Sequence, residues 1–308
     1  PRSTLSALGL LRNARSMLRY RLITGPILIV AILLVVWLDE WIAATTGGAR
    51  RGVCVFAVGL LIAPLMARET AEMLTRVGVA TRAWLAMLAA TAAYVGIALL
   101  PSVASPAMAV GIAATLFVAI LVAGLVTFSN GRNIRGVMAA TGGLLVVSVY
   151  AGVLLAFWPL IRRDHSAWLL VGAVLTTKSC DIGAYFTGVS IGRHKLIPWL
   201  SPKKSWEGLV GGVLTATLVG ALLAWCSGGL AANGDHLPIW LGALGGALVG
   251  VVGQGGDLAE SLFKRDAGVK DSGRILPGMG GVLDVLDSLL LAGPVVYWLL
   301  VVAGLLVA

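Results

Sequence analysis

The chain has 308 residues, of which 58% are hydrophobic and only 12% are charged, and its formal net charge is +9. A soluble globular domain carries about 45–50% apolar and about 25% charged residues, so this composition excludes an ordinary soluble domain. The apolar runs are long and do not alternate with a period of two, which predicts membrane-spanning helices and not a β-barrel. The basic residues lie in loops between these runs, which argues against nucleic-acid binding and fits loops that face an anionic membrane leaflet.

Nine apolar segments are candidate membrane spans. They cover residues 22–38, 53–66, 83–100, 107–128, 137–160, 167–188, 208–227, 238–255 and 286–307. We therefore predict an all-α fold, a polytopic transmembrane helical bundle of about nine spans. The segment before the first span carries five arginines and no acid: Arg2, Arg12, Arg15, Arg19 and Arg21. It is expected to be a basic amphipathic stretch on the membrane surface, and a cleaved signal peptide is the alternative.

The loops between the spans differ in their content of Lys and Arg. If the N-terminus is cytoplasmic, the loops on the inner side are 67–82, 129–136, 189–207 and 256–285, and each holds at least two basic residues, including Arg132 and Arg135 in the second loop. The outer loops near 101–106 and 228–237 hold none. This bias predicts a cytoplasmic N-terminus. Arg50–Arg51 and Arg162–Arg163 depart from the rule, although acids lie near both pairs.

The two halves of the chain differ in their acids. Residues 1–160 hold four of the 14 acids, whereas residues 257–287 alone hold six. Carboxylates beside membrane spans are costly unless they pair, bind a cation or face water. We therefore expect N-terminal transmembrane helices with a basic cytoplasmic segment over 1–160 and a catalytic transmembrane region over 161–308. Small residues let helices approach closely in lipid, so Gly211–Gly212 and Gly245–Gly246 are expected at helix interfaces.

The first polar stretch of the second half falls between residues 178 and 208. Lys178 and Asp181 lie inside an expected span, three residues apart and so on one helix face. An ionisable pair in a span indicates function, with a structural ion pair as the alternative. Lys203 and Lys204 precede the next helix, whose N-terminus favours anions. We expect them to bind a phosphate chain or a lipid head group, with a purely topological role as the alternative.

The second polar stretch runs from residue 253 to residue 288. On a helix over 256–266, four polar side chains share one face: Asp257, Glu260, Ser261 and Lys264. Asp284 and Asp287 share a face of the following helix, and a loop rich in glycine joins the two helices. Mg²⁺ binds through one or two carboxylates plus substrate phosphates, and Lys and Arg contact the remaining phosphate oxygens. This stretch predicts a divalent-cation and phosphate site, with a solvated loop of local ion pairs as the alternative.

Three elements in order resemble the phosphatidate cytidylyltransferase (CDP-diacylglycerol synthase) family, over about residues 175–305. The family signature appears as Ser261-Leu-Phe-Lys264-Arg265, Lys270-Asp271, Pro277-Gly-Met-Gly-Gly281 and Asp284-Val-Leu-Asp287. The upstream elements are Asp181 to Gly188 and Ser201 to Gly208. Met279 stands where the family usually has His, and Val285 where it usually has Arg. Any role of that His as acid, base or phosphate contact is therefore absent or moved, and the lost Arg removes one phosphate donor, while the acids and the other basic residues match.

The resemblance implies transfer of a cytidylyl group from CTP to phosphatidate, giving CDP-diacylglycerol and pyrophosphate for phospholipid synthesis. Asp257 and Asp284 are then the principal ligands of Mg²⁺, alone or with a second cation, and Asp287 and Glu260 support them. Asp257, Lys264, Asp284 and Asp287 form the catalytic set. Lys264, Arg265 and Lys270 hold the triphosphate, Lys203 and Lys204 engage either substrate, and Asp181 with Lys178 lines the cavity. Ser261 and Asp271 complete the substrate-binding set.

The resemblance also implies a multi-pass enzyme of the inner membrane whose active site faces the cytoplasm. Its expected partners are CTP, phosphatidate and membrane lipids, with no nucleic acid. The resemblance leaves open whether the enzyme forms a homodimer. Three alternatives remain: a CTP-dependent lipid kinase, which makes CDP and a phospholipid; a cation-coupled membrane transporter; and an inactive, degenerate paralogue, given Met279 and Val285. The charges cluster near one membrane surface, whereas transporter sites usually lie near the midplane.

Overall fold

The computed structural model describes residues 2–103, 105–129, 134–230 and 237–307. Its helices are α1 (Arg2–Thr45), α2 (Val53–Arg76), α3 (Ala83–Val103), α4 (Pro106–Ser129), α5 (Val137–Val147), the π-helix η1 (Ser148–Val153), α6 (Leu154–Asp164), α7 (Ala167–Ile191), α8 (Trp206–Leu230), α9 (Ile239–Asp266) and α10 (Leu283–Val307). Because α5, η1 and α6 follow one another without a break, the described residues form nine continuous helices, and these match the nine predicted spans.

Eight helices within the described ranges are long and apolar enough to cross a membrane. The ninth, α7, is not one of them, and it carries the charged pair Lys178 and Asp181 at its middle. The all-α bundle is therefore confirmed, and the chain is an integral membrane protein. A short antiparallel hairpin, β1 (Lys195–Ile197) and β2 (Ser201–Ser205), was not expected; it lies directly before α8, and its second strand carries Lys203 and Lys204.

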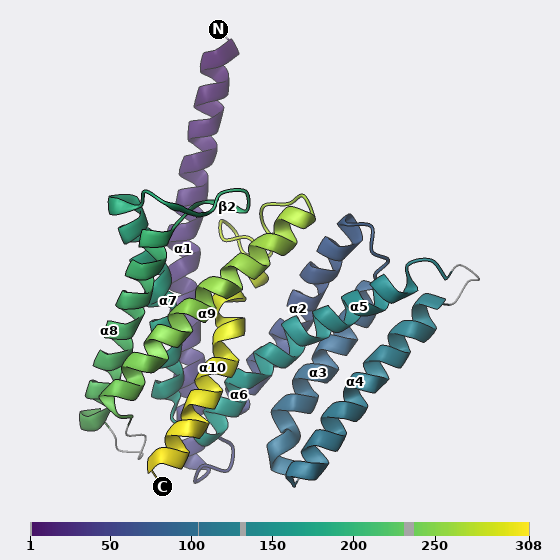
Figure 1. Ribbon diagram of the computed structural model, residues 1–308, viewed down its shortest axis with the longest axis vertical. Helices are drawn as coiled ribbons and strands as arrows, with labels where there is room; N and C mark the ends of the chain where they lie inside the picture. The colour runs from purple at the N-terminus through teal and green to yellow at the C-terminus, as the bar shows by residue number, and fades with distance from the viewer. Residues whose placement is uncertain (1, 104, 130–133, 231–236, 308) are drawn as a thin grey trace.

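The connections rich in basic residues gather at one end of the bundle (Figure 1). The N-terminal end of α1, the α2–α3 connection, the β1–β2 hairpin and the α9–α10 connection all lie at this end, and the C-terminal end of α10 lies at the other. The predicted loop 129–136 includes Arg132, which lies outside the described residues. We call this the basic end of the bundle.

Glycines set the close packing of α7, α8 and α9. A Cβ on Gly212 would overlap the backbone of Cys180 in α7, and a Cβ on Gly246 would overlap that of Ala216 in α8. A Cβ on Gly211 would overlap the side chain of Thr187. The prediction of interfaces is thus confirmed at these three glycines. Gly245 is different, because a Cβ there would meet only the tip of Leu299.

A buried ion pair explains why Arg162 departs from the charge rule. Its Nε atom lies 2.7 Å from Oδ2 of Asp39, and neither side chain is exposed; its Nη2 atom donates to Glu40 at 2.8 Å. Asp39 also accepts hydrogen bonds from the backbone N–H groups of Gly52 and Cys54, where α2 begins. This network joins α1, α2 and α6 at the end opposite the basic end.

Candidate active site

Three carboxylates from two helices meet where α9 packs against α10. One oxygen each of Asp257, Glu260 and Asp287 lies within 4.8 Å of the other two. Asp257 and Glu260 reach this point together because residues three apart share a helix face. Glu260 is fully buried and Asp287 is 7% exposed. The convergence of acids from two helices is thus confirmed for these residues, which we call the carboxylate group.

Asp284 does not belong to the carboxylate group. Its Oδ1 accepts from Lys264 Nζ at 2.8 Å, and its Oδ2 accepts from Ser272 N, Ser272 Oγ and Gly281 N at 2.7–2.8 Å. Four donors therefore saturate this side chain and tie the α9–α10 connection to the start of α10. Asp287 groups with Asp257 and Glu260, whereas Asp284 does not, and the metal-binding roles expected of the four acids stay predictions.

Three lysines surround the carboxylate group, each from a different element. Lys204 of β2 places Nζ 2.5 Å from Oδ2 of Asp257. Lys264 of α9 donates to Glu260 at 2.6 Å, in addition to Asp284. Because each ammonium is held by a carboxylate, the cluster presents alternating charges and not a uniformly acidic patch.

The third lysine, Lys178 of α7, confirms the predicted intramembrane pair. Its Nζ lies 3.6 Å from Oδ2 of Asp181 and 4.0 Å from Oδ1 of Asp287, and it donates to Ser288 Oγ at 2.8 Å. Gln254 of α9 donates to the other oxygen of Asp181 at 2.8 Å. The sequence analysis did not identify Gln254 and Ser288 as site residues, because both are uncharged.

The other predicted residues lie outside this cluster. Lys203, Arg265, Lys270 and Asp271 are exposed, and Ser261 is half-buried on α9. Arg265 donates to the carbonyl oxygen of Val269 at the end of α9. Their substrate-binding roles stay predictions; the exposed residues belong to the basic end and not to the carboxylate group.

The donor set fits a hard divalent cation. All three ligand candidates offer carboxylate oxygens, which Mg²⁺ prefers. Glu260 Oε1 is buried and has no hydrogen-bond partner within the described ranges. An unpaired buried carboxylate oxygen is costly, and a bound cation satisfies it. Asp257, Glu260 and Asp287 are thus the described carboxylates whose oxygens lie close enough together to hold one cation.

Comparison with known proteins identifies the family of the chain. A sequence model described as the cytidylyltransferase family matches residues 19–303. The chain belongs to the cytidylyltransferase family. The phosphatidate cytidylyltransferase of Pseudomonas aeruginosa is 41% identical over 164 residues, which cover 53% of this chain and 57% of that protein. The Synechocystis protein of the same name is 47% identical over 125 residues, 40% of each chain.

A third relative carries no activity in its name. The uncharacterized protein YnbB of Escherichia coli is 37% identical over 195 residues, 57% of this chain and 60% of its own. Over these matches, the chain spans about half the length of the curated relatives. Membership of the cytidylyltransferase family is therefore shown, while the substrates of this chain are a matter for proposal.

The signature turn of the family explains its glycines here. Leu276 accepts backbone hydrogen bonds from Met279 and Gly280, and its own N–H donates to the Gly280 carbonyl, which closes a tight turn. Gly278 and Gly280 have φ of 78° and 99°, a region that side chains disfavour. A Cβ on Gly280 would overlap the Asp284 carboxylate. Met279, half-buried in this turn, makes no polar contact through its side chain among the described residues.

Glu69 of α2 is a further polar residue that the sequence did not single out. It is 3% exposed and accepts hydrogen bonds from Val282 N and Leu283 N at 2.9 Å and from Ser272 Oγ at 3.1 Å. Its carboxylate thus caps the N-terminus of α10, where the helix dipole favours a negative charge. The only sequence signal was an acid near the end of the second span, and nothing linked it to residues more than 200 positions away.

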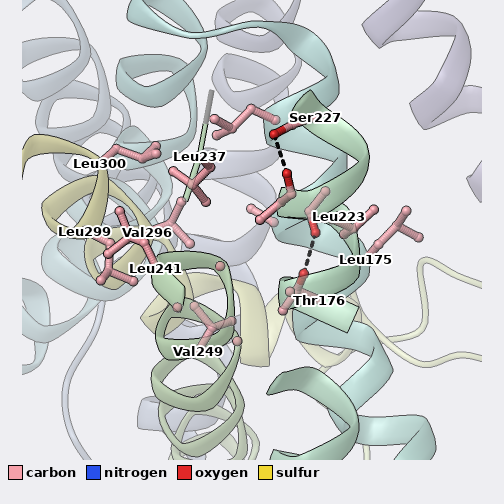
Figure 2. A pocket seen from close by; sticks show the side chains of 18 of the residues that line it. Leu175, Thr176, Leu223, Ser227, Leu237, Leu241, Val249, Val296, Leu299 and Leu300 are labelled. Carbon is pink, nitrogen blue, oxygen red and sulfur yellow. Dashed lines mark hydrogen bonds between the residues drawn. The ribbon is translucent and has the colours of Figure 1, made fainter. Parts of the chain in front are cut away.

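An apolar cavity of about 330 Å³ lies between α7, α8, α9 and α10, away from the basic end. Figure 2 shows Leu223, Leu241, Val296 and other aliphatic side chains around it. The hydroxyls of Thr176 and Ser227 donate to carbonyls of their own helices at 2.8 and 2.7 Å. They therefore offer no free donor to the cavity. It suits an apolar occupant and not water.

Proposed function

We propose that this member of the cytidylyltransferase family is a phosphatidate cytidylyltransferase, which makes CDP-diacylglycerol and pyrophosphate from CTP and phosphatidate. One observation carries the proposal: three carboxylates and three lysines from four elements form one cluster inside a membrane bundle. Such a cluster is suited to bringing two polyanions together in a membrane protein. The names of the relatives support the same reaction.

The proposed reaction needs no activated Ser or Cys, because the phosphate of phosphatidate is already an anionic nucleophile. One of its oxygens forms a bond to the α-phosphorus of CTP. The bond from that phosphorus to the oxygen bridging to the β-phosphorus breaks, and its electron pair leaves with pyrophosphate. Positioning and charge stabilisation account for most catalysis in phosphoryl transfer. Lys178, Lys204 and Lys264 are the cations placed to bind the phosphate oxygens.

We propose Mg²⁺ as the cofactor, held by Asp257, Glu260 and Asp287. When bound, this ion neutralises charge on the phosphates and on the leaving pyrophosphate. Without the ion, the positive charge of the three lysines is too small to offset both the carboxylates and the substrate phosphates. The carboxylates and the phosphates would then repel each other. In the proposed mechanism the three carboxylates do not move. The phosphate oxygens of the substrate compete with Asp257 for the ammonium group of Lys204.

We propose that the basic end faces the cytoplasm, where CTP is found. The hairpin, the α2–α3 connection and the α9–α10 connection support this placement, since they gather basic residues at one end (Figure 1). Inner-leaflet phosphatidate would then enter sideways from the bilayer. The exposed apolar faces of the helices are in keeping with lipid on all sides.

We propose that the apolar cavity receives an acyl chain of phosphatidate. Thr176, the last residue of α7 that lines the cavity, precedes Lys178 by two residues, about 3 Å along α7. From Thr176 to Ser166 the cavity runs about 15 Å, half of a hydrocarbon core of about 30 Å. A lipid whose phosphate lies at Lys178 therefore has an apolar space of one leaflet's depth beside it.

The deciding experiment incubates the purified chain in detergent micelles with CTP labelled in the α-phosphate, phosphatidate and Mg²⁺, followed by lipid chromatography. We expect the label in a CDP-lipid and an equal amount of pyrophosphate. In a parallel incubation with CTP labelled in the γ-phosphate and diacylglycerol as the lipid alcohol, CDP with a labelled phospholipid would identify a lipid kinase instead. Absence of any labelled lipid at full CTP occupancy would refute the proposed transfer.

A further inference from the structure

One buried tyrosine from the N-terminal half of the chain packs against α9, the helix that carries Asp257 and Glu260, and its hydroxyl is unpaired within the described ranges. Tyr150 is 7% exposed, and its hydroxyl has no hydrogen-bond partner within the described ranges. Buried hydroxyls are nearly always paired, because an unpaired one loses its hydrogen bonds to water without replacement. Packing alone does not explain a tyrosine at position 150, because a phenylalanine would pack equally well. The hydroxyl therefore needs another explanation.

The backbone around Tyr150 is unusual and firmly held. The residue lies in η1, a six-residue π-helix between α5 and α6. Single π-helical turns inside α-helices occur frequently at functional sites, because they turn side chains away from the regular spacing. Two residues later, a Cβ on Gly152 would overlap the carbonyl oxygen of Ala90 in α3. Close contact with α3 therefore fixes the π-helical turn and, with it, the direction of Tyr150.

The ring of Tyr150 packs against the helix that carries two of the three carboxylates. It meets Phe263 of α9 edge to face, with ring centroids 5.3 Å apart and planes at 80°. Phe263 follows Glu260 by three residues, so both lie on one face of α9.

Two unpaired polar atoms thus belong to side chains of the same part of the bundle: the hydroxyl of Tyr150, whose ring packs on Phe263 of α9, and Oε1 of Glu260, one turn earlier on α9. One is a donor and the other is an acceptor, and the described residues satisfy neither. An oxygen-bearing ligand with a cation matches both, since the cation binds the carboxylate and the ligand oxygen accepts from the hydroxyl.

We propose that the Tyr150 hydroxyl is a ligand-binding group of the active site, which donates a hydrogen bond to an oxygen held at the carboxylate group. That oxygen belongs to a substrate phosphate or to water on the bound cation, and both present the same lone-pair acceptor. The inference rests on the proposed function and deepens it, because it brings the N-terminal half of the chain into direct contact with the ligand.

The test is Tyr150→Phe, which keeps the ring contact with Phe263 and removes only the hydroxyl. We expect the variant to melt at the same temperature as the wild type or higher, while kcat/KM falls about 10–100-fold, the effect of one hydrogen bond to a charged group. Separate titrations of CTP, phosphatidate and Mg²⁺ then identify the oxygen by which saturation curve moves. Unchanged kinetics in all three titrations would overturn the proposal.

Tyr94→Phe is the matched control. Tyr94 is fully buried, stacks on Phe56 and donates to the Phe56 carbonyl oxygen at 2.9 Å. Removing this satisfied hydroxyl is expected to lower the melting temperature and leave the three saturation curves unchanged, the opposite of Tyr150→Phe. A Tyr150→Phe variant that behaves like this control would show a structural hydroxyl and refute the inference.

A binding measurement separates this inference from the proposed reaction. CTP with Mg²⁺ raises the melting temperature of a protein that binds it, whether or not turnover occurs. We expect a smaller increase for Tyr150→Phe than for the wild type at equal ligand concentration. If the wild type forms no CDP-lipid, the proposed function fails, and this comparison still decides whether Tyr150 contacts the ligand; equal increases would refute it.

Discussion

At the scale of single residues, two neighbouring aspartates of one helix have different tasks. Asp284 and Asp287 are three residues apart at the start of α10, and the expected roles were a principal metal ligand for Asp284 and a supporting one for Asp287. Asp284 is saturated by Lys264 and by donors of the α9–α10 connection, whereas Asp287 joins the carboxylate group. What separates them is the backbone of the connection, whose N–H groups at Ser272 and Gly281 point at Asp284.

Replacing each aspartate by asparagine tests this division. We expect Asp287→Asn to lower kcat/KM at least about 100-fold and to raise the Mg²⁺ concentration for half-maximal rate, because it removes a cation ligand. Asp284→Asn is expected to lower the melting temperature and leave the Mg²⁺ requirement unchanged. Asp266→Asn, at an exposed site on the end of α9, serves as the control. The reverse pattern, with only Asp284→Asn altering the Mg²⁺ requirement, would restore Asp284 as the principal ligand.

Removal of the metal gives a second test of the carboxylate group. With Mg²⁺ chelated, we expect activity to vanish and to return on addition of Mg²⁺. The melting temperature is also expected to fall, because the cation binds the folded state and satisfies the unpaired Glu260 oxygen. Full activity in excess chelator, measured by CDP-lipid formation, would exclude the proposed cofactor.

At the scale of elements, a carboxylate from α2 holds the start of α10. Glu69 accepts two backbone N–H groups there, and no room exists for a Cβ at Gly273 or Gly281 beside it. Glu69→Gln places amide N–H groups against these donors, so we expect a loss of about 1–3 kcal/mol of unfolding free energy. The displaced α10 should also lower activity, through misplacement of Asp287. Thermal unfolding and the assay measure the two effects.

Glu72→Gln is the control for this substitution on the same helix. Glu72 pairs with Arg68 at 2.9 Å, and both side chains are more than half exposed. An exposed pair contributes less than about 1 kcal/mol, so neither stability nor activity should change appreciably. Equal effects of the two glutamine variants would show that the cap on α10 has no special importance.

The apolar cavity between α7 and α10 yields a prediction on lipid selectivity. A Cβ on Gly172 would meet only the tip of Leu223, at 3.6 Å, so Gly172→Leu fills the cavity without striking backbone. We expect KM for dioleoyl-phosphatidate to rise at least about fivefold, the burial of one or two methylene groups, with KM for CTP and for dioctanoyl-phosphatidate nearly unchanged. Gly111→Leu, where nothing lies within 4 Å, is the control. Equal KM changes for both lipids would place the acyl chain elsewhere.

At the scale of the whole molecule, the helical spacing of polar residues predicted more of the candidate site than the loop sequences did. The period of 3.6 residues was enough to group Asp257 with Glu260 and to pair Lys178 with Asp181. It was silent on the β1–β2 hairpin that brings Lys204 to Asp257, because a short hairpin has almost no apolar pattern. It was equally silent on Glu69 and Tyr150, whose contacts depend on how distant helices cross.

Contacts between the halves also bear on the expected division at residue 160. Glu69 of α2 reaches the start of α10, and Thr24 of α1 donates to the Pro277 carbonyl oxygen at 3.0 Å in the signature turn. The aromatic contact of Tyr150 with Phe263 also crosses this boundary. The two halves therefore differ in sequence character, yet the N-terminal helices hold the turn and the helix that carry the carboxylates.

The buried ion pair between Arg162 and Asp39, at the end opposite the basic end, also holds helices of the N-terminal half together. Arg162 is fully buried with Asp39, and loss of one partner leaves an uncompensated charge. We expect Arg162→Met to cost about 3–5 kcal/mol of unfolding free energy. Arg163→Met, which breaks a partly exposed pair with Asp164, should cost less than about 1 kcal/mol. Because the network is remote from the carboxylate group, KM for CTP in the folded fraction should not change in either variant.

A double variant decides whether the loss of stability in Arg162→Met comes from the unpaired charge of Asp39 or from the lost packing of the arginine side chain. Replacing Asp39 as well, in Arg162→Met with Asp39→Leu, removes both buried charges and should recover part of the stability, since apolar replacements of a buried pair are often neutral. Recovery will be incomplete, because Asp39 also caps α2 through the N–H groups of Gly52 and Cys54. Thermal unfolding of the double variant measures this. If it is no more stable than Arg162→Met, the unpaired carboxylate is not the cause of the loss, and the packing of the arginine side chain between α1, α2 and α6 is.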